Sequence, residues 1–266
     1  MHLRHLREAV GVTVEQAAGR LGWSAARLAR IEAGQTGVSP RDVRDLTAVY
    51  DVPAEEVDLL LRCTREARQK GWWQLHGTVL TGAYVGLEAA AHAIRGYEAL
   101  TVPGLLQTEG YARALVRHGW PDLDADEADK RVHLRMNRQA LLTQDNPPAV
   151  WIVVDEAVLH RPVGGRRVMR EQLDHLLRTA DLPTVTVQVL PFAAGAHSGM
   201  DGAFTMLLYE GSTSQNVVFV SNAAGGLFLE KEEELQRYAF VFDHLRANAL
   251  PPDHAIAMIA GLVKEL

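Results

Sequence analysis

The segment from residue 13 to residue 34 constrains the fold more than any other part of the chain, because it encodes two short helices and a tight turn. Thr13 can cap the first helix by accepting a bond from the backbone of Gln16, whose side chain can reach back to the cap. Gly22 can adopt the left-handed conformation that ends this helix, and Ser24 can cap the next one. The pattern therefore predicts two helices that meet across three residues.

The second helix of this segment has an apolar inner face and a small, basic outer face. Leu28 and Ile31 form the inner stripe, and Trp23 can pack on Leu28 to fix the angle at which the chain enters the helix. On the outer face, alanine side chains let a backbone approach closely and can touch thymine methyl groups, whereas an arginine can grip guanine or a phosphate. The pattern predicts a surface suited to the major groove. Its candidate DNA contacts are Thr13, Gln16, Ser24, Ala25, Ala26, Arg27, Arg30 and Arg41.

Further helices are predicted on both sides of this segment. Apolar residues recur at a helical spacing from Leu3 to Val10 and stop at a glycine. Ser39, followed by a proline and by an acid in the first turn, marks the start of a fourth helix. A fifth is predicted after Pro53. Residues 1–62 are therefore expected to form one small helical domain.

The charge of the chain is unevenly distributed. The whole chain has a formal net charge of −6, but residues 1–50 hold seven arginines against five acids, a balance of +2 that leaves −8 for residues 51–266. A mildly basic head on an acidic body suits a protein that targets DNA locally. The same balance argues against a protein that coats nucleic acid indiscriminately.

The sequence TVEQAAGRLGWSAARLARIEAG, residues 13–34, resembles the helix-turn-helix of the Xre and lambda-repressor-like regulators. The resemblance implies a five-helix DNA-binding domain whose third helix reads bases and whose dimers bind near-palindromic half-sites on double-stranded DNA. It also implies a structural ion pair between Arg7 and Glu32. One position departs from the family, because helix two commonly begins with a Gln that contacts DNA and begins here with Val14. That contact is lost or is replaced by Gln16.

Two alternatives stay open for this motif. A helical bundle could use it only for packing or for protein contacts. Arg27 and Arg30 could anchor phosphates instead of reading bases, because half or more of protein–DNA hydrogen bonds go to the backbone.

Residues 63–79 are predicted to form a linker helix. The stretch from residue 62 to residue 76 carries five basic residues, one of them a histidine, and the adjacent Trp72 and Trp73. These tryptophans could stack on bases as a second nucleic-acid surface. Docking of the linker onto the larger domain is favoured, because large aromatic side chains usually serve burial.

Residues 80–266 are predicted to form a larger domain with helices and a mixed β-sheet, so the fold class of the chain is α+β. The helical run VMREQLDHLLRTA separates the first two predicted strands and indicates a crossover between a parallel pair, whereas short gaps indicate hairpins among the later strands. The predicted strands are VWIVV, TVTVQVL, AFTMLLY and VVFV, with GLFLE as a candidate fifth. Helices are predicted over residues 84–100, 108–117, 124–142 and 230–250, and from residue 253.

Three segments of this region also carry a family resemblance. They are LEAAAHAIRGYEALTVPGLLQTEGYARALV, DEAVLHRPVGG with VMREQLDHLL, and VTVQVLPFAAGAHSGMDGAF. They resemble the domain of unknown function found downstream of Xre-type motifs in many actinobacterial regulators, which are often described as antitoxin-like and tend to be encoded beside a small partner protein. The resemblance covers nearly all of residues 80–266 and carries over no catalytic activity or residue.

One glycine-rich loop is a candidate for nucleophilic chemistry. It holds His197, Ser198 and Asp201, which could supply a nucleophile and its base. A catalytic triad is recognised by geometry, however, and polar residues in a loop of small residues are more often turn formers. No catalytic residue is therefore expected.

Two other groups of polar residues are also interpreted as structural and not as functional sites. Residues 164–167 (GGRR) could bind phosphate ahead of a helix, but a solvated basic turn is favoured. Asp155 and Glu156 could serve acid–base chemistry or a metal, but no ligand spacing accompanies them and helix capping is favoured. We expect neither a metal nor a cofactor.

The bulk properties and the motifs together lead to three functional hypotheses. The single cysteine, Cys63, excludes an internal disulfide, and no apolar run approaches the roughly 18 residues of a membrane span, so we expect a cytoplasmic protein. The leading hypothesis is a dimeric transcriptional regulator whose body senses a small partner protein or a ligand. The alternatives are an enzyme fused to a DNA-targeting head and an antitoxin-like protein that sequesters a partner and regulates its own operon. A closed apolar cavity in the body would favour the sensing of a ligand, and a cleft lined by titratable groups would favour an enzyme. An exposed apolar patch would favour a protein partner.

Overall fold

The chain forms two compact units, Met1–Gln74 and Leu75–Leu266. The computed structural model describes residues 2–32, 38–53, 57, 60, 61, 64, 82–210, 216–222 and 225–266. The linker helix expected over residues 63–79 lies outside the described residues, except for Thr64, which is helical. Cys63, Trp72 and Trp73 also lie outside them.

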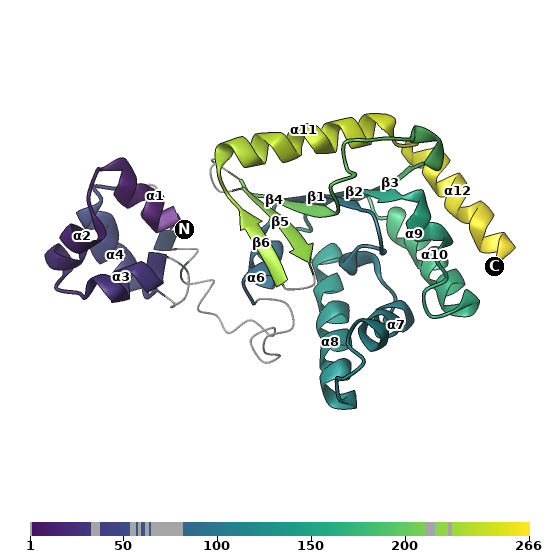
Figure 1. Cartoon of the computed structure of the whole chain (residues 1–266), viewed down its shortest axis with the longest axis horizontal. Coiled ribbons are helices and arrows are strands. Elements are labelled where there is room, and N and C mark those ends of the chain that lie inside the picture. Colours follow the sequence, from purple (N-terminus) through teal and green to yellow (C-terminus); the bar gives the residue numbers. More distant parts are fainter. Residues whose placement is uncertain are drawn as a thin grey trace. The chain divides into compact units, whose positions relative to one another are not determined.

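The described part of the N-terminal unit is helical (Figure 1). Thr13 and Gln16 form the expected capping box ahead of the second helix, and Gly22 ends that helix in the left-handed conformation, with φ of 66°. Ser39 forms a capping box with Asp42 ahead of the fourth. The helices are α1 (His2–Ala9), α2 (Val14–Leu21), α3 (Ala25–Glu32) and α4 (Pro40–Val49).

A small apolar core holds these helices together. The predicted inner face of α3 is confirmed, because Leu28 is fully buried and Ile31 is buried beside it. Trp23, just ahead of α3, packs against the same core. Most of the fifth helix expected after Pro53 lies outside the described residues. In the part of this region that is described, residues 57, 60, 61 and 64 are helical. The buried core residues are Ala17, Ala18, Leu28, Ile31, Leu46 and Tyr50.

The larger unit is built on a six-stranded mixed sheet with strand order β3-β2-β1-β4-β5-β6. The first three strands are parallel, and the remaining pairings are antiparallel. The expected α+β class, the crossover between β2 and β3 and the later hairpins are thus confirmed. The strands are β1 (Ala93–Glu98), β2 (Ala149–Asp155), β3 (Val185–Leu190), β4 (Phe204–Leu208), β5 (Val217–Asn222) and β6 (Gly225–Leu229).

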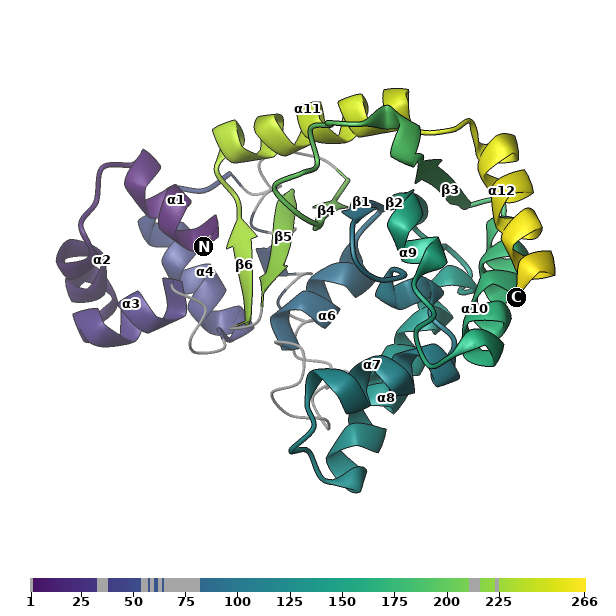
Figure 2. The ribbon, with the colours of Figure 1, turned by 45° about the vertical axis from the view of Figure 1, so that its right-hand side comes forward.

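Helices cover both faces of this sheet. Helix α11 lies along one face, whereas α6, α7 and α8 lie on the opposite side (Figures 1 and 2). Helix α12 packs against α10 and the edge strand β3. The helices are α6 (Gly82–Ala90), α7 (Glu109–Gly119), α8 (Ala125–Arg138), α9 (Glu156–His160), α10 (Arg166–Ala180), α11 (Glu232–Asn248) and α12 (Pro252–Glu265), with single turns η2 (Gly104–Leu106), η3 (Gln139–Leu142) and η4 (Phe192–Ala194).

The helix predicted over residues 84–100 is wrong in its second half. The chain leaves α6 after Ala90 and becomes strand β1, which lies between β2 and β4 in the middle of the sheet. Gly96 sits so close to both neighbours that an added Cβ would lie 3.1 Å from the Phe204 carbonyl oxygen and 3.3 Å from Ile152 Cδ1. Pairing with two distant strands overrides the helical spacing of this alanine-rich run.

A buried ion pair joins α6 to α8 beneath the sheet. Arg138 donates from Nε and Nη2 to the two carboxylate oxygens of Glu88, at 2.6 and 2.7 Å, and Tyr84 donates its hydroxyl to the same carboxylate at 2.9 Å. Burial, with the charge of Glu88, raises the pKa of Tyr84 well above its usual value. Because every member has a partner, this network fixes α6, the first helix of the larger unit among the described residues.

Candidate nucleic-acid interface

The turn between α2 and α3 sets the direction in which α3 projects. The backbone N–H of Trp23 donates to the Ala18 carbonyl at 2.9 Å, which closes the chain over the end of α2. Ser24 then caps α3, its Oγ accepting from the backbone N–H of Arg27 at 3.2 Å. With Leu28 fixed in the core, one side of α3 faces away from the domain.

A buried ion pair anchors α3 from behind. Arg7 donates from Nε and Nη2 to the two carboxylate oxygens of Glu32 at 2.8 and 2.9 Å, and its Nη1 donates to the Val12 carbonyl at 2.8 Å. Tyr50, at the end of α4, donates its hydroxyl to Glu32 at 3.0 Å. The hydrogen bonds that Arg7 donates to Glu32 raise the pKa of Arg7, and burial raises the pKa of Tyr50. The pair implied by the family resemblance is therefore formed, and it ties α1, α3 and α4 together.

Arg30 projects from the outer face of α3, beside small side chains. Ala26 and Ala29 are exposed and Ala25 is half-buried, so the helix surface next to Arg30 is shallow. Within the described part of the chain, Arg30 has neither a hydrogen bond nor an ion pair. None of the described residues therefore occupies the donors of its guanidinium.

Arg27 differs from Arg30 because it is held within the domain. Its Nη2 donates to Asp42 Oδ1 at 2.9 Å, and its Cζ lies 4.0 Å from the centre of the Trp23 ring. The carboxylate comes from the first turn of α4, so α3 and α4 are joined through this arginine. The sequence identified Arg27 as a candidate contact but gave Asp42 only the role of an acid in the first turn of a helix.

The capping box of α2 limits what Thr13 and Gln16 can offer to DNA. Gln16 Oε1 accepts from the Thr13 backbone N–H at 3.0 Å, and Thr13 Oγ1 accepts from the Gln16 backbone N–H at 3.2 Å. The Gln16 side-chain NH₂ has no hydrogen bond in the described structure and stays available as a donor. Val14 packs against the core, and its apolar side chain cannot make the polar contact that the family has at that place.

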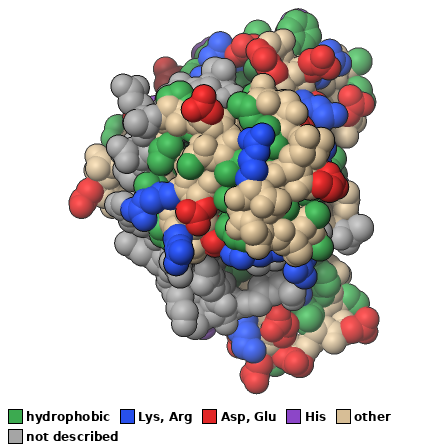
Figure 3. Space-filling view, turned by 90° about the vertical axis from the view of Figure 1, so that its left-hand side faces the viewer, with side chains coloured by type: hydrophobic (Ala, Val, Ile, Leu, Met, Phe, Trp, Pro, Cys, Tyr) green, Lys and Arg blue, Asp and Glu red, His purple; other side chains and the backbone are tan. Residues whose placement is uncertain are grey.

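Arg41 extends the basic surface onto α4. Its side chain is 90% exposed, with Nε 4.0 Å from Asp45 Oδ2. Burial opposes ionisation of Asp42, but hydrogen bonds from Ser39 and the charges of Arg27 and Arg41 hold its pKa below the usual value. On the face drawn in Figure 3, Lys and Arg side chains are interspersed with acidic, hydrophobic and other side chains, so basic charge is spread and not continuous.

In the larger unit, the loop around His197 does not bring its three polar residues together. His197 Nε2 faces Asp155 Oδ2 at 3.9 Å, and its Nδ1 accepts from the Gly199 N–H at 3.2 Å. Ser198 Oγ donates to the Val241 carbonyl of α11 at 3.2 Å. Ser198 thus has a structural bond, and the partner of His197 is a strand residue that the sequence did not connect with it.

The two acids at the end of β2 make local bonds. Asp155 caps α9 by accepting from the Ala157 N–H at 2.9 Å, and its other oxygen accepts from the Tyr97 hydroxyl at 3.1 Å. Glu156 accepts from the Phe192 N–H at 2.6 Å. The described residues hold no cluster of three or more potential metal ligands.

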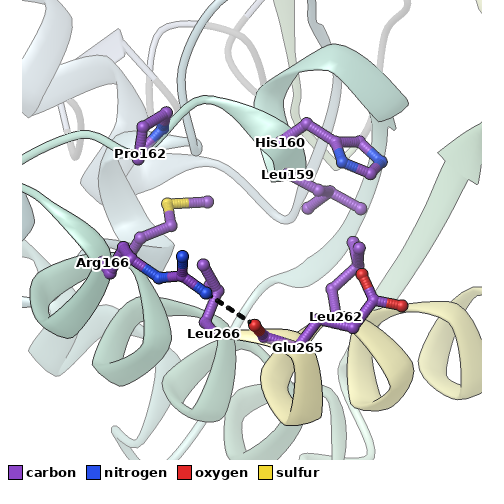
Figure 4. Close-up of a pocket in the computed structure, with 8 residues that line it drawn as sticks. Leu159, His160, Pro162, Arg166, Leu262, Glu265 and Leu266 are labelled. Atoms are coloured by element: carbon purple, nitrogen blue, oxygen red, sulfur yellow. Dashed lines mark hydrogen bonds between the residues drawn. The ribbon is translucent and has the colours of Figure 1, made fainter.

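A cavity of about 300 Å³ lies between α9, the start of α10 and the end of α12 (Figure 4). Arg166, from the basic turn noted in the sequence, donates to the Glu265 carbonyl at 2.8 Å on one side of it. The other basic residue of that turn, Arg167, forms an ion pair with Glu171. The cavity is lined by Leu159, His160, Pro162, Arg166, Met169, Leu262, Glu265 and Leu266.

The N-terminal unit is a helix-turn-helix domain. Two capped helices meet across a three-residue turn and present the outer face of α3, and the family model described as a helix-turn-helix domain matches residues 1–60. The protein belongs to the family described as a domain of unknown function (DUF5753), whose model matches residues 81–261. No curated protein and no solved structure matches the chain. None of the described helices is long and apolar enough to cross a membrane.

The expected order of a helix-turn-helix domain followed by a large domain of unknown function is thereby confirmed. A helix-turn-helix domain of this kind binds DNA, which places the protein among DNA-binding regulators. The narrower assignments, to the Xre type and to the antitoxin-like group, stay predictions.

Proposed function

We propose that the protein is a sequence-specific transcriptional regulator in the cytoplasm that binds double-stranded DNA as a dimer and reads bases through α3. The observation that carries the proposal is Arg30, exposed and unpaired among the described residues, beside the exposed Ala26 and Ala29. Small side chains allow the helix to approach the floor of the major groove, and a free guanidinium can form a bidentate contact with guanine.

Genomic footprinting of the bound DNA followed by titration tests this proposal. The Arg30→Ala variant is expected to weaken binding to the recovered operator by about 1–3 kcal/mol and to affect unrelated DNA less. Arg4→Ala is the matched control, because it also removes one exposed guanidinium. That guanidinium lies on α1, outside the proposed interface, and is bonded to Glu8. Equal losses for Arg30→Ala on both DNAs would make Arg30 a phosphate anchor, and failure to recover any operator would contradict the proposed function.

Dimerisation is assigned to the larger unit. One helix-turn-helix contacts about one half-site, so specificity normally requires two heads spaced one DNA turn, roughly 34 Å, apart. The acidic balance of residues 51–266 suits contacts with protein better than contacts with DNA. Sedimentation and operator titration of residues 1–78 and of the full chain test this assignment, which fails if the isolated head dimerises and binds as tightly as the full chain.

The larger unit is also proposed to carry the regulatory signal, in the form of a small protein encoded nearby. Binding of that protein can shift the spacing of the two heads only if its affinity differs between the two arrangements. The acidic balance favours a basic partner. Titration of operator binding with and without the neighbouring protein tests the idea, and an unchanged operator affinity would refute it. The same titration separates a regulator from an antitoxin-like protein, whose main effect is to sequester the partner.

A small ligand is a second candidate signal, favoured by the cavity between α9, α10 and α12. Its volume is at the lower end of the range for ligand pockets, and its lining combines apolar side chains with the polar His160, Arg166 and Glu265. We further propose that the protein is not an enzyme. The bond between Ser198 and Val241 supports this, because a hydroxyl already committed to a carbonyl is poorly placed as a nucleophile.

A further inference from the structure

The Arg27 guanidinium is held on two sides before any DNA is bound. Asp42 accepts one of its N–H bonds at 2.9 Å, and the Trp23 ring covers it at 4.0 Å. An exposed arginine normally moves among many rotamers and loses that freedom when it binds. The two contacts restrict Arg27 in advance, which lowers the entropic cost of a later contact.

Asp42 is itself fixed by the start of α4. Its Oδ2 accepts from the Ser39 backbone N–H at 3.0 Å, and its own backbone N–H donates to Ser39 Oγ at 3.0 Å. The Asp42 side chain is 18% exposed, whereas that of Arg27 is 44% exposed. The carboxylate therefore lies behind the guanidinium, and the arginine presents the accessible surface of the pair.

The geometry favours a phosphate over a base as the partner of Arg27. A guanidinium has five N–H donors, and the bond to Asp42 uses one of them. To reach a base edge, Arg27 would have to leave Asp42 and Trp23, whereas a phosphate can accept its remaining donors in place. Arg41, which is 90% exposed in the same first turn of α4 as Asp42, adds a second positive charge there.

We propose that Arg27 contacts a DNA phosphate and that Asp42 is the positioning residue that orients it. This inference rests on the proposed DNA-binding function and goes beyond it, because it gives an acidic residue a part in specificity. In the correct docking, a phosphate meets the open side of Arg27. In other dockings a DNA phosphate approaches the Asp42 carboxylate without meeting the Arg27 guanidinium. Repulsion between the two negative charges then disfavours these dockings.

The test measures affinity against salt concentration for the recovered operator and for unrelated DNA, using the full chain. Arg27→Ala is expected to reduce the slope of log affinity against log salt by about 0.9, the contribution of one phosphate contact. Asp42→Asn is expected to lower the ratio of operator to unrelated-DNA affinity by about threefold or more. In the Arg27→Ala background, Asp42→Asn is expected to leave that ratio unchanged.

Ser39→Ala is the control for loss of the α4 cap, because it removes the Ser39 hydroxyl but keeps the Ser39 backbone N–H that holds the Asp42 carboxylate. Thermal unfolding of each variant measures any loss of stability separately from binding. The inference is overturned if Arg27→Ala leaves the salt slope unchanged, or if Ser39→Ala lowers the affinity ratio as much as Asp42→Asn does. If the unmodified chain binds neither DNA, the proposed function itself has failed, whatever the variants do.

Discussion

Removing the Glu32 carboxylate is expected to destabilise the N-terminal unit strongly. In Glu32→Ala, Arg7, a residue that is only 6% exposed, loses two hydrogen bonds and its buried counter-charge, and the Tyr50 hydroxyl loses its acceptor. The more exposed Glu8 carboxylate stays 3.7 Å from Arg7 Nη2. Breaking a buried ion pair from one side costs about 3–5 kcal/mol. The bond from Arg7 to the Val12 carbonyl remains and keeps the loss within that range. Because small domains are stable by only about 5–15 kcal/mol, this loss is a large fraction of the stability of the unit.

Urea unfolding of the full chain, followed by circular dichroism, measures this loss. Glu32→Gln is the matched control, because it keeps the volume and one acceptor but removes the charge and the second acceptor. Its expected loss is smaller, about 1.5–3 kcal/mol, the value of a hydrogen bond to a charged group. DNA binding should be measured well below the unfolding transition. A Glu32→Ala variant that unfolds like the unmodified protein yet no longer binds DNA would refute the reasoning and place Glu32 at the interface.

Two further predictions concern the larger unit. His197→Ala and Asp201→Ala should each leave DNA binding intact, and a hydrolase assay in which the unmodified protein is active and both variants are inactive would overturn the non-enzyme proposal. Burial raises the pKa of Glu98 to about 7 against the opposing charges of Arg135 and Arg138, so its ionisation destabilises the folded unit. Below about pH 4.5, Glu98 is protonated in both the folded and the unfolded chain. Above that pH the unfolded chain loses the proton more readily, so the loss of folding stability grows until pH 7 is passed. Glu98→Gln should therefore raise the free energy of unfolding at pH 8 by at most about 3 kcal/mol and leave it unchanged at pH 4, as urea unfolding at both values can check.

The N-terminal unit was predictable because its signals are local. The cap at Thr13, the left-handed Gly22 and the spacing of Leu28 and Ile31 each act within one or two helical turns. Local capping and helical periodicity are the features that a sequence displays most directly. The ion pair of Arg7 and Glu32, which is not local, came instead from the family resemblance.

What the sequence missed depends on contacts between distant residues. The strand at Ala93–Glu98 follows an alanine-rich helix without a proline, and its helical spacing concealed its pairing with β2 and β4. Asp42 was identified as an acid in the first turn of a helix, but nothing in the sequence showed that Arg27 would reach it. His197 was grouped with its neighbours in the loop, whereas the fold sets it against Asp155.

The position of β1 in the middle of the sheet has a consequence for the order in which the chain folds. Tyr97 pairs with Val153 on one side and with Phe204 on the other, so the central strand cannot be completed until most of the chain has left the ribosome. The helices of the N-terminal unit need only near neighbours, and structures rich in local contacts form fastest. During synthesis, the DNA-binding head is therefore complete while the larger unit is still unfinished. Under the proposed function, a newly made chain therefore has a folded DNA-binding head before the unit proposed to dimerise it and carry its signal is complete.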